Sequence, residues 1–143
     1  MTTTQRVESF KDILKKHNLK NEVPTNKKIL EVLKKICNHN RVGVFAEQNH
    51  NEVRIFMRDS NLSGDIGIVN LHPTKGTHWV LFINNYYFDS YGCPSPKNIL
   101  KYIKFKYDKC IYSEYRTQKQ DSLCASYCLY IIFLADDDQR PAV

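Results

Sequence analysis

The second half of the sequence contains a histidine, an aspartate and a cysteine that together could perform nucleophilic catalysis. His78 and Asp89 flank an aromatic-rich segment, and Cys124 follows further along the chain. An imidazole can accept the proton of a thiol, and a carboxylate that is hydrogen-bonded to the imidazole orients it. The thiolate then attacks a carbonyl carbon, so these three side chains in contact would cleave an acyl bond. This chemistry requires elements that bring them together.

A β-hairpin is expected to bring His78 to Asp89. Two apolar, aromatic-rich runs flank Asn84-Asn85, and Asn tolerates the positive φ that two-residue hairpin turns require. With the turn at these residues, Val80 faces Asp89 and His78 lies on the same face, so the His78 and Asp89 side chains are diagonal neighbours. A shift of one residue would put them on opposite faces, so the pairing depends on this turn.

The third side chain, Cys124, is expected at the start of a helix. Polar residues 114–122 precede it, and an apolar run from Leu129 predicts a mostly buried helix. Unpaired N–H groups and the positive end of the helix dipole favour a thiolate at such a position. The same N–H groups can hold a developing oxyanion, and the amide of Gln118 can add a hydrogen bond. Cys128, one turn into the helix, is the rival thiol and is expected to be a packing residue.

Hydrophobic periodicity assigns the other elements. The hairpin strands are apolar on both faces, which is typical of strands in the middle of a sheet that is covered on both sides. The expected helices are 7–16, 25–37 with Thr25 or Asn26 as its cap, and a segment with Ser95 as N-cap and Pro96 as its first residue; the expected strands are 42–46, 53–57, 66–71 and 110–113, besides the hairpin.

The composition indicates one globular domain. The chain has 143 residues, of which 42% are hydrophobic and 25% charged, as is usual for such a domain. No apolar run is long enough to cross a bilayer, and the N-terminal residues lack the apolar core of a signal peptide. Five cysteines, without a Cys-x-x-Cys pair, argue against a disulfide framework and against zinc. We therefore expect no membrane partner and a reducing compartment, the cytoplasm or the nucleus.

The chain is also basic, with a formal net charge of +6 and a pI of about 9.0. Excess positive charge favours polyanionic partners such as nucleic acid or an acidic protein. The alternative is that the lysines are simply solvated on helix faces. Both interpretations remain open at the level of sequence.

The order and spacing of several motifs resemble the clan of cysteine peptidases that includes the adenovirus protease, adenain, and the Ulp/SENP enzymes. The similarity is closest in character to the adenain-like proteases of large DNA viruses and Polinton-type elements, and it covers about residues 66–134. It is carried by Gly76-Thr77-His78-Trp79, by Phe88-Asp89-Ser90-Tyr91-Gly92, by Gln118 six residues before Cys124, and by the Cys-x-x-x-Cys spacing of Cys124 and Cys128.

The resemblance implies a role for each matching residue. Cys124 would form the acyl-enzyme, His78 would transfer the proton, and Asp89 would orient the imidazole. Gln118 would stabilise the oxyanion, and Trp79 would form a wall of the substrate site, although Trp79 also fits a core position.

The implied fold is α+β, a papain-like, circularly permuted cysteine peptidase fold in which a mixed β-sheet packs against the helix that carries the nucleophile. Residues 1–143 would form a single peptidase domain, with N-terminal helices in 1–40 and the catalytic sheet and helices in 41–135. The implied activity is cleavage of viral or transposon polyproteins by a monomer in the cytoplasm, in the nucleus or in association with virions. No metal or other required cofactor is implied, and nucleic acid is a candidate activator.

Two departures from the family pattern keep other functions open. The family usually has glycine after the nucleophile, where this chain has Ala125, and the sequence ends soon after the Cys124 helix. One alternative is a catalytically degenerate, basic nucleic-acid-binding module on the same fold. Another is a deconjugase (isopeptidase) for ubiquitin-like modifiers. Gln120 is a second candidate for the oxyanion amide if the loop is tighter, and the loop acids Asp59 and Asp65 are candidates for substrate contact.

Overall fold

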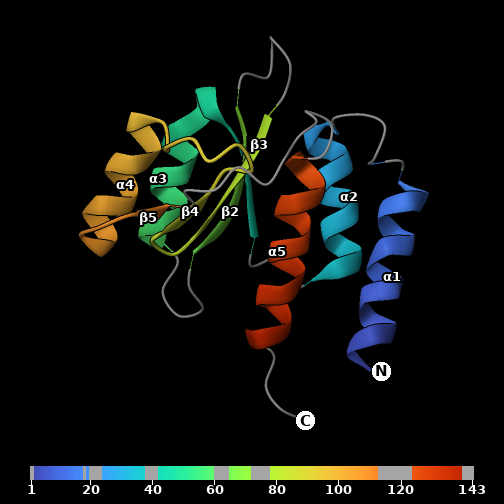
Figure 1. The fold of residues 1–143 in the computed structure, drawn as a ribbon. Helices are drawn as coiled ribbons and strands as arrows, with labels where there is room; N and C mark the ends of the chain where they lie inside the picture. Colours follow the sequence, from blue (N-terminus) through green and yellow to red (C-terminus); the bar gives the residue numbers. More distant parts are fainter. Residues whose placement is uncertain are drawn as a thin grey trace.

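The fold is a five-stranded β-sheet with helices on both faces (Figure 1). The computed structural model describes residues 2–17, 19, 24–37, 42–59, 65–71, 78–112 and 124–139. The helices are α1 (Thr3–Lys16), α2 (Asn26–Ile36), α3 (His50–Asp59), α4 (Lys97–Tyr107) and α5 (Cys124–Gln139), with a 3₁₀ turn, η2, at Glu47–Asn49. The strands are β1 (Val42–Ala46), β2 (Ile66–Leu71), β3 (His78–Ile83), β4 (Tyr86–Phe88) and β5 (Ile111–Tyr112).

The sheet combines parallel and antiparallel neighbours. Its order is β1-β2-β3-β4-β5, in which β1–β2 and β4–β5 are parallel and the two pairs between them are antiparallel. Every residue of β2 is buried, and β3 is buried along its middle. Strands without a polar face fit only inside a sheet that is covered on both sides. The expected α+β class with a mixed sheet is therefore confirmed.

The hairpin of β3 and β4 turns at the expected residues. Asn84 and Asn85 form the turn, and Asn84 has a φ of 53°. A non-glycine residue rarely adopts this left-handed conformation, and Asn is one of the few that does so readily. The register that follows from this turn is confirmed by the pairs Leu81–Phe88, Phe82–Tyr87 and Ile83–Tyr86.

Two hydrophobic cores lie on opposite faces of the sheet. On one face α1, α2 and α5 cover residues such as Ile68 and Leu81. On the other face α3 and α4 cover residues such as Val69 and Val80. Neighbouring residues of a strand point to opposite faces, so each central strand contributes to both cores. In Figure 1 the sheet separates α5, drawn in red, from α3 and α4.

Residues 53–57 belong to α3, so the expected strand at this place is wrong. Val53 and Met57 are buried, whereas Ile55 between them is 41% exposed. A strand would place all three side chains on one face, but a helix brings together only residues three or four apart. Val, Ile and Phe favour strands locally, yet here the burial of the Val53–Met57 pair in the second core favours the helix.

The N-terminal caps of α2 and α4 can be compared with the caps expected from the sequence. Thr25 caps α2 as expected, because its Oγ1 accepts a hydrogen bond from the Lys28 N–H at 3.2 Å. Ser95 does not cap α4. The cap is Pro96, the helix begins at Lys97, and the Ser95 hydroxyl instead donates to the Pro96 carbonyl at 3.1 Å. The α4 helix therefore begins one residue later than expected.

Candidate active site

His78 and Asp89 meet across the hairpin, as the register requires. The distance between His78 Nε2 and Asp89 Oδ1 is 2.8 Å. The Asp89 side chain is 4% exposed and the His78 side chain 16% exposed. A carboxylate so well shielded from water holds the imidazole strongly. Because Nε2 is engaged by Asp89, Nδ1 is the ring nitrogen left for a second partner.

The turn after β4 fixes the carboxylate and adds an aromatic neighbour. Asp89 Oδ1 also accepts the Tyr91 N–H at 2.7 Å, and the Gly92 N–H donates to the Asp89 carbonyl at 2.8 Å. Gly92 has a φ of 73°, a conformation that glycine adopts without strain. The Tyr91 ring stacks on the imidazole of His78, with 4.8 Å between centroids and 27° between planes. Tyr91 therefore belongs to the site.

Cys124 is the first residue of α5, as expected, and its sulfur contacts the strand that carries His78. The Trp79 N–H donates a hydrogen bond to Cys124 Sγ over 3.3 Å. Cys124 is also near enough to His78 to raise the pKa of the imidazole. The sulfur thus lies at a helix start and accepts an N–H bond from the residue that follows His78 in β3. Cys124 is buried.

Cys128 bonds the other main-chain group of Trp79, its carbonyl oxygen. Its thiol donates a hydrogen bond to the carbonyl oxygen of Trp79 at 3.4 Å. Continuing the hairpin register would place Trp79 opposite Ser90, but β4 ends at Phe88. A longer β4 would have paired with the N–H and the C=O of Trp79. Instead, the sulfurs of Cys124 and Cys128, which lie one helical turn apart on α5, bond these two groups.

The surroundings of the site shift the pKa values of His78 and Cys128. Burial disfavours the charged form of His78, but its hydrogen bond with Asp89, the nearby Cys124 side chain and the charges of both groups outweigh this and raise the pKa of His78 to about 9. Burial raises the pKa of the Cys128 thiol well above its ordinary value, and the negative charges of Cys124 and Asp89 add to the effect. Cys128 is therefore a protonated packing residue, as expected from the sequence.

Trp79 and Ala125 are core residues. The Trp79 indole is fully buried and its N–H donates to the Pro24 carbonyl at 3.0 Å, so this side chain has no exposed surface with which to contact a substrate. Trp79 contributes to the site through its main chain. Ala125 is also fully buried in the core that contains α5. Gln118 and Gln120 lie outside the described residues.

The two acids that the sequence suggests for substrate contact, Asp59 and Asp65, both have partners within the chain, and Asp59 is the last residue of α3 rather than part of a loop. Asp65 is fully buried and pairs with Lys106 Nζ at 2.7 Å. Asp59 is exposed and pairs with its neighbour Arg58 at 2.9 Å.

Tyr91 is a site residue that the sequence analysis does not predict. Its place two residues after Asp89, in a turn that ends in glycine, is the signal that could have identified it.

No protein-family model matches this sequence, and a search of curated proteins finds no match either.

Within the described ranges, no helix is both long enough and apolar enough to cross a membrane. In the same part of the chain no three His, Cys, Asp or Glu side chains are grouped as metal ligands. All five cysteines are free thiols.

Proposed function

We propose that this chain is a cysteine endopeptidase of the adenain and Ulp/SENP type. The observation that carries the proposal is the grouping of Asp89, His78 and Cys124. Asp89 lies 2.8 Å from His78, and Cys124, the first residue of α5, bonds the next residue of the same strand and is near enough to raise the pKa of the imidazole. This group contains an orienting carboxylate, a proton-transfer group and a nucleophile close together, which is the arrangement that acyl transfer requires.

In the proposed resting state the thiol proton lies on His78. The raised pKa of His78, about 9, favours an imidazolium at neutral pH, and the Trp79 N–H stabilises the thiolate of Cys124. The thiolate attacks the carbonyl carbon of a peptide, and a carbon–sulfur bond forms as the carbonyl oxygen becomes an oxyanion. His78 then protonates the leaving amine, and the carbon–nitrogen bond breaks.

The second half of the reaction restores the enzyme. Water loses a proton to His78 as its oxygen attacks the thioester on Cys124, and the carbon–sulfur bond breaks to release the carboxylic acid. The Cys124 N–H at the helix start is the proposed main-chain oxyanion donor, and Gln118 is the proposed side-chain donor. Throughout, Asp89 keeps the imidazole oriented and stabilises its charge.

The proposal also includes the fold family, the substrates and the compartment. The packing of α5 on β3 and the order of helices, strands and final helix support a papain-like fold in circularly permuted form. We propose viral or transposon polyproteins as substrates, cleaved by a monomer in the cytoplasm, nucleus or virion. Neither a metal nor another cofactor has a role in this chemistry, and the net charge of +6 supports nucleic acid as an activator.

One observation favours a second candidate function. The Cys124 side chain is fully buried, so a peptide reaches its sulfur only if the surface around it opens. If it does not open, the same fold with its positive charge would act as a non-catalytic nucleic-acid-binding module. Binding that weakens steeply with salt, without any reaction at Cys124, is the mark of that function.

A library of peptides that carry a C-terminal vinyl sulfone separates the two functions. A peptidase adds the electrophile to Cys124, and intact-protein and peptide mass spectrometry then locate the adduct. We expect labelling of Cys124 in the wild type and in Cys128→Ala, and none at this position in His78→Ala. Exposed Cys93 serves as the internal control for non-specific addition. Labelling confined to Cys93 would contradict the peptidase proposal.

A further inference from the structure

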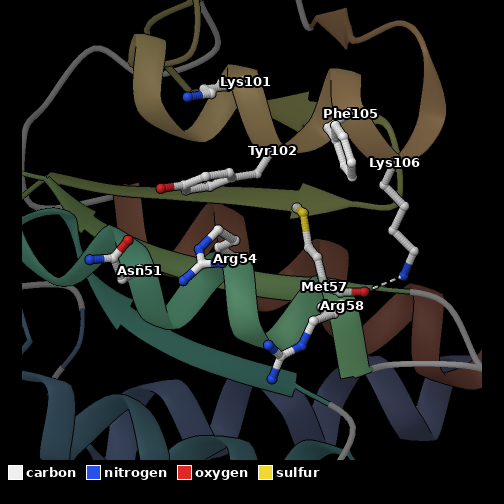
Figure 2. A pocket seen from close by; sticks show the side chains of 8 residues that line it. All are labelled: Asn51, Arg54, Met57, Arg58, Lys101, Tyr102, Phe105 and Lys106. Carbon is white, nitrogen blue, oxygen red and sulfur yellow. Dashed lines mark hydrogen bonds between the residues drawn. The ribbon is translucent and has the colours of Figure 1, made fainter.

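A groove of about 630 Å³ lies between α3 and α4, on the face of the sheet opposite α5 (Figure 2). Its volume is in the range of ligand-binding clefts. It is distinct from the candidate active site, because neither His78 nor Cys124 lines it. Both helices contribute side chains that approach one another across the groove in Figure 2.

The groove has an apolar floor at Met57 and an apolar wall at Phe105. Met57 extends from α3 toward α4, and Phe105 extends from α4 toward α3 (Figure 2). Met57 is buried, whereas Phe105 is 91% exposed, more than any other large hydrophobic side chain among the described residues. Tyr102 forms one end, where its hydroxyl is 2.8 Å from His50 Nδ1 and its ring stacks on the same imidazole. A phenyl group exposed beside a flexible thioether is typical of a surface that takes up an apolar side chain.

The rim of the groove is cationic, but only part of its charge is available. Lys106 Nζ bonds Asp65 Oδ2 and the Met57 carbonyl, each at 2.7 Å. Arg58 pairs with Asp59 at 2.9 Å. Arg54 and Lys101 line the groove from opposite helices, and neither forms an ion pair or hydrogen bond with another described residue. Two free cations therefore flank an apolar floor.

We propose that this α3–α4 groove binds an acidic peptide segment of a partner protein, which inserts an apolar side chain against Phe105 and places carboxylates beside Arg54 and Lys101. Charge complementarity supports an acidic ligand, and the apolar floor supports a peptide that docks one hydrophobic face between two helices. A nucleic-acid strand is less suitable, because it needs a row of free cations and open stacking surfaces. Here Lys106 and Arg58 are already paired, and His50 covers one face of Tyr102.

The test starts from a displayed library of random peptides of about 12 residues, enough for three helical turns. The wild-type chain selects binders, and the affinity of a fluorescein-labelled binder is measured by fluorescence anisotropy. We expect the selected peptides to combine Asp or Glu with Leu, Phe or Trp. Reversing both free charges, in Arg54→Glu with Lys101→Glu, should weaken binding by about 20-fold or more, and Phe105→Ala by about tenfold.

Matched variants separate this site from general charge and from the candidate active site. Lys104→Glu reverses one lysine charge on the exposed surface of α4 but outside the groove. This variant should leave the affinity within about twofold. Cys124→Ala should bind equally well, because α5 lies on the opposite face of the sheet. The binding proposal therefore stands or fails independently of peptidase activity. Circular dichroism confirms that each variant is folded.

Three results would overturn the proposal. The first is a selection that enriches no peptides, or only peptides without acidic residues. The second is a selected peptide whose affinity survives the reversal of Arg54 and Lys101. The third is a labelled single-stranded oligonucleotide of mixed sequence that binds more tightly than any selected peptide and loses affinity in the same double variant, which would assign the groove to nucleic acid.

Discussion

Two buried aspartates at opposite ends of the β2–β3 pair have different neighbours, and hence different roles. Asp89 follows β4 and bonds His78. The pKa of His78 is about 9, so its imidazole can gain and lose a proton near neutral pH. Asp65 precedes β2 and bonds the ammonium of Lys106 and the hydroxyl of Tyr107. Burial and the nearby Asp65 charge raise the pKa of Tyr107 above its ordinary value, so that group does not give up its proton at neutral pH.

The surroundings of Asp65 explain its role. Its N–H donates to the Asn84 side chain at 2.7 Å, and the Asn84 N–H donates back to the Asp65 carbonyl at 2.6 Å. Asp65 thus links the hairpin turn to the start of β2 and to α4. Asp89 instead links the hairpin to a group that can transfer a proton. A buried carboxylate indicates chemistry only when its partner can change protonation state near neutral pH.

The largest expected effect distinguishes the two carboxylates by activity. On a peptide substrate identified by the electrophile library, Asp89→Asn should lower kcat by about 10³-fold or more, because the neutral amide does not stabilise the charge of the imidazolium and can present its NH₂ group to the wrong ring tautomer. Asp65→Asn should leave kcat within about threefold. Steady-state kinetics on both variants measures this difference. Equal losses in the two variants would contradict the separation of roles.

The next effect is a pH dependence of stability that belongs to the Asp89 site. The pKa of His78 is raised from 6.5 to about 9, so the folded protein binds this proton more tightly than the unfolded chain does. The resulting stabilisation is complete below pH 6.5 and is lost as the pH rises through about 9. It amounts to at most about 3 kcal/mol. Urea unfolding across this window should show the decline in the wild type, and His78→Gln should lack it.

A smaller effect is expected on stability at the Asp65 site. Asp65→Asn removes the charge that pairs with Lys106 and weakens the bond from Tyr107. Because the Lys106 side chain is 30% exposed and can turn toward water, the expected loss is about 2 kcal/mol rather than the value for a fully buried pair. Urea denaturation measures it. If this variant also altered the reactivity of Cys124, the two sites would be coupled rather than separate.

The smallest expected effect concerns the Tyr91 ring that stacks on His78. Tyr91→Ala should lower kcat by about tenfold, because the imidazole loses the ring that limits its orientation, whereas Tyr91→Phe keeps that ring and should restore most of the rate. A role in folding alone would lower stability in Tyr91→Ala without changing the kcat of the folded fraction. Kinetics combined with thermal unfolding separates the two cases.

The parts that the sequence predicts correctly depend on local signals. Asn84-Asn85 determines the hairpin register, and with it the His78–Asp89 contact. The change from polar to apolar residues at Cys124 marks the start of α5. Both inferences use neighbours along the chain or directly across a turn, where the geometry leaves few alternatives.

The parts that the sequence does not predict depend on contacts between distant segments. Residues 53–57 have strand-forming side chains but become helical because the sheet buries Val53 and Met57. The bonds from Trp79 to the two cysteines exist because β4 ends early, which no residue pattern indicates. The groove likewise needs α3 and α4 side by side, although β2, β3 and β4 separate them in the chain.

The most direct test of the central claim is the rate at which iodoacetamide alkylates each cysteine as a function of pH. Mass spectrometry of digested protein gives the rates of Cys124, Cys128 and exposed Cys93 in one sample. An activated nucleophile predicts that Cys124 reacts faster than Cys93 at neutral pH, that Cys128 stays unmodified, and that His78→Ala removes the advantage of Cys124. If Cys124 reacts no faster than Cys93 in the wild type, the thiol is not activated and the peptidase account is contradicted.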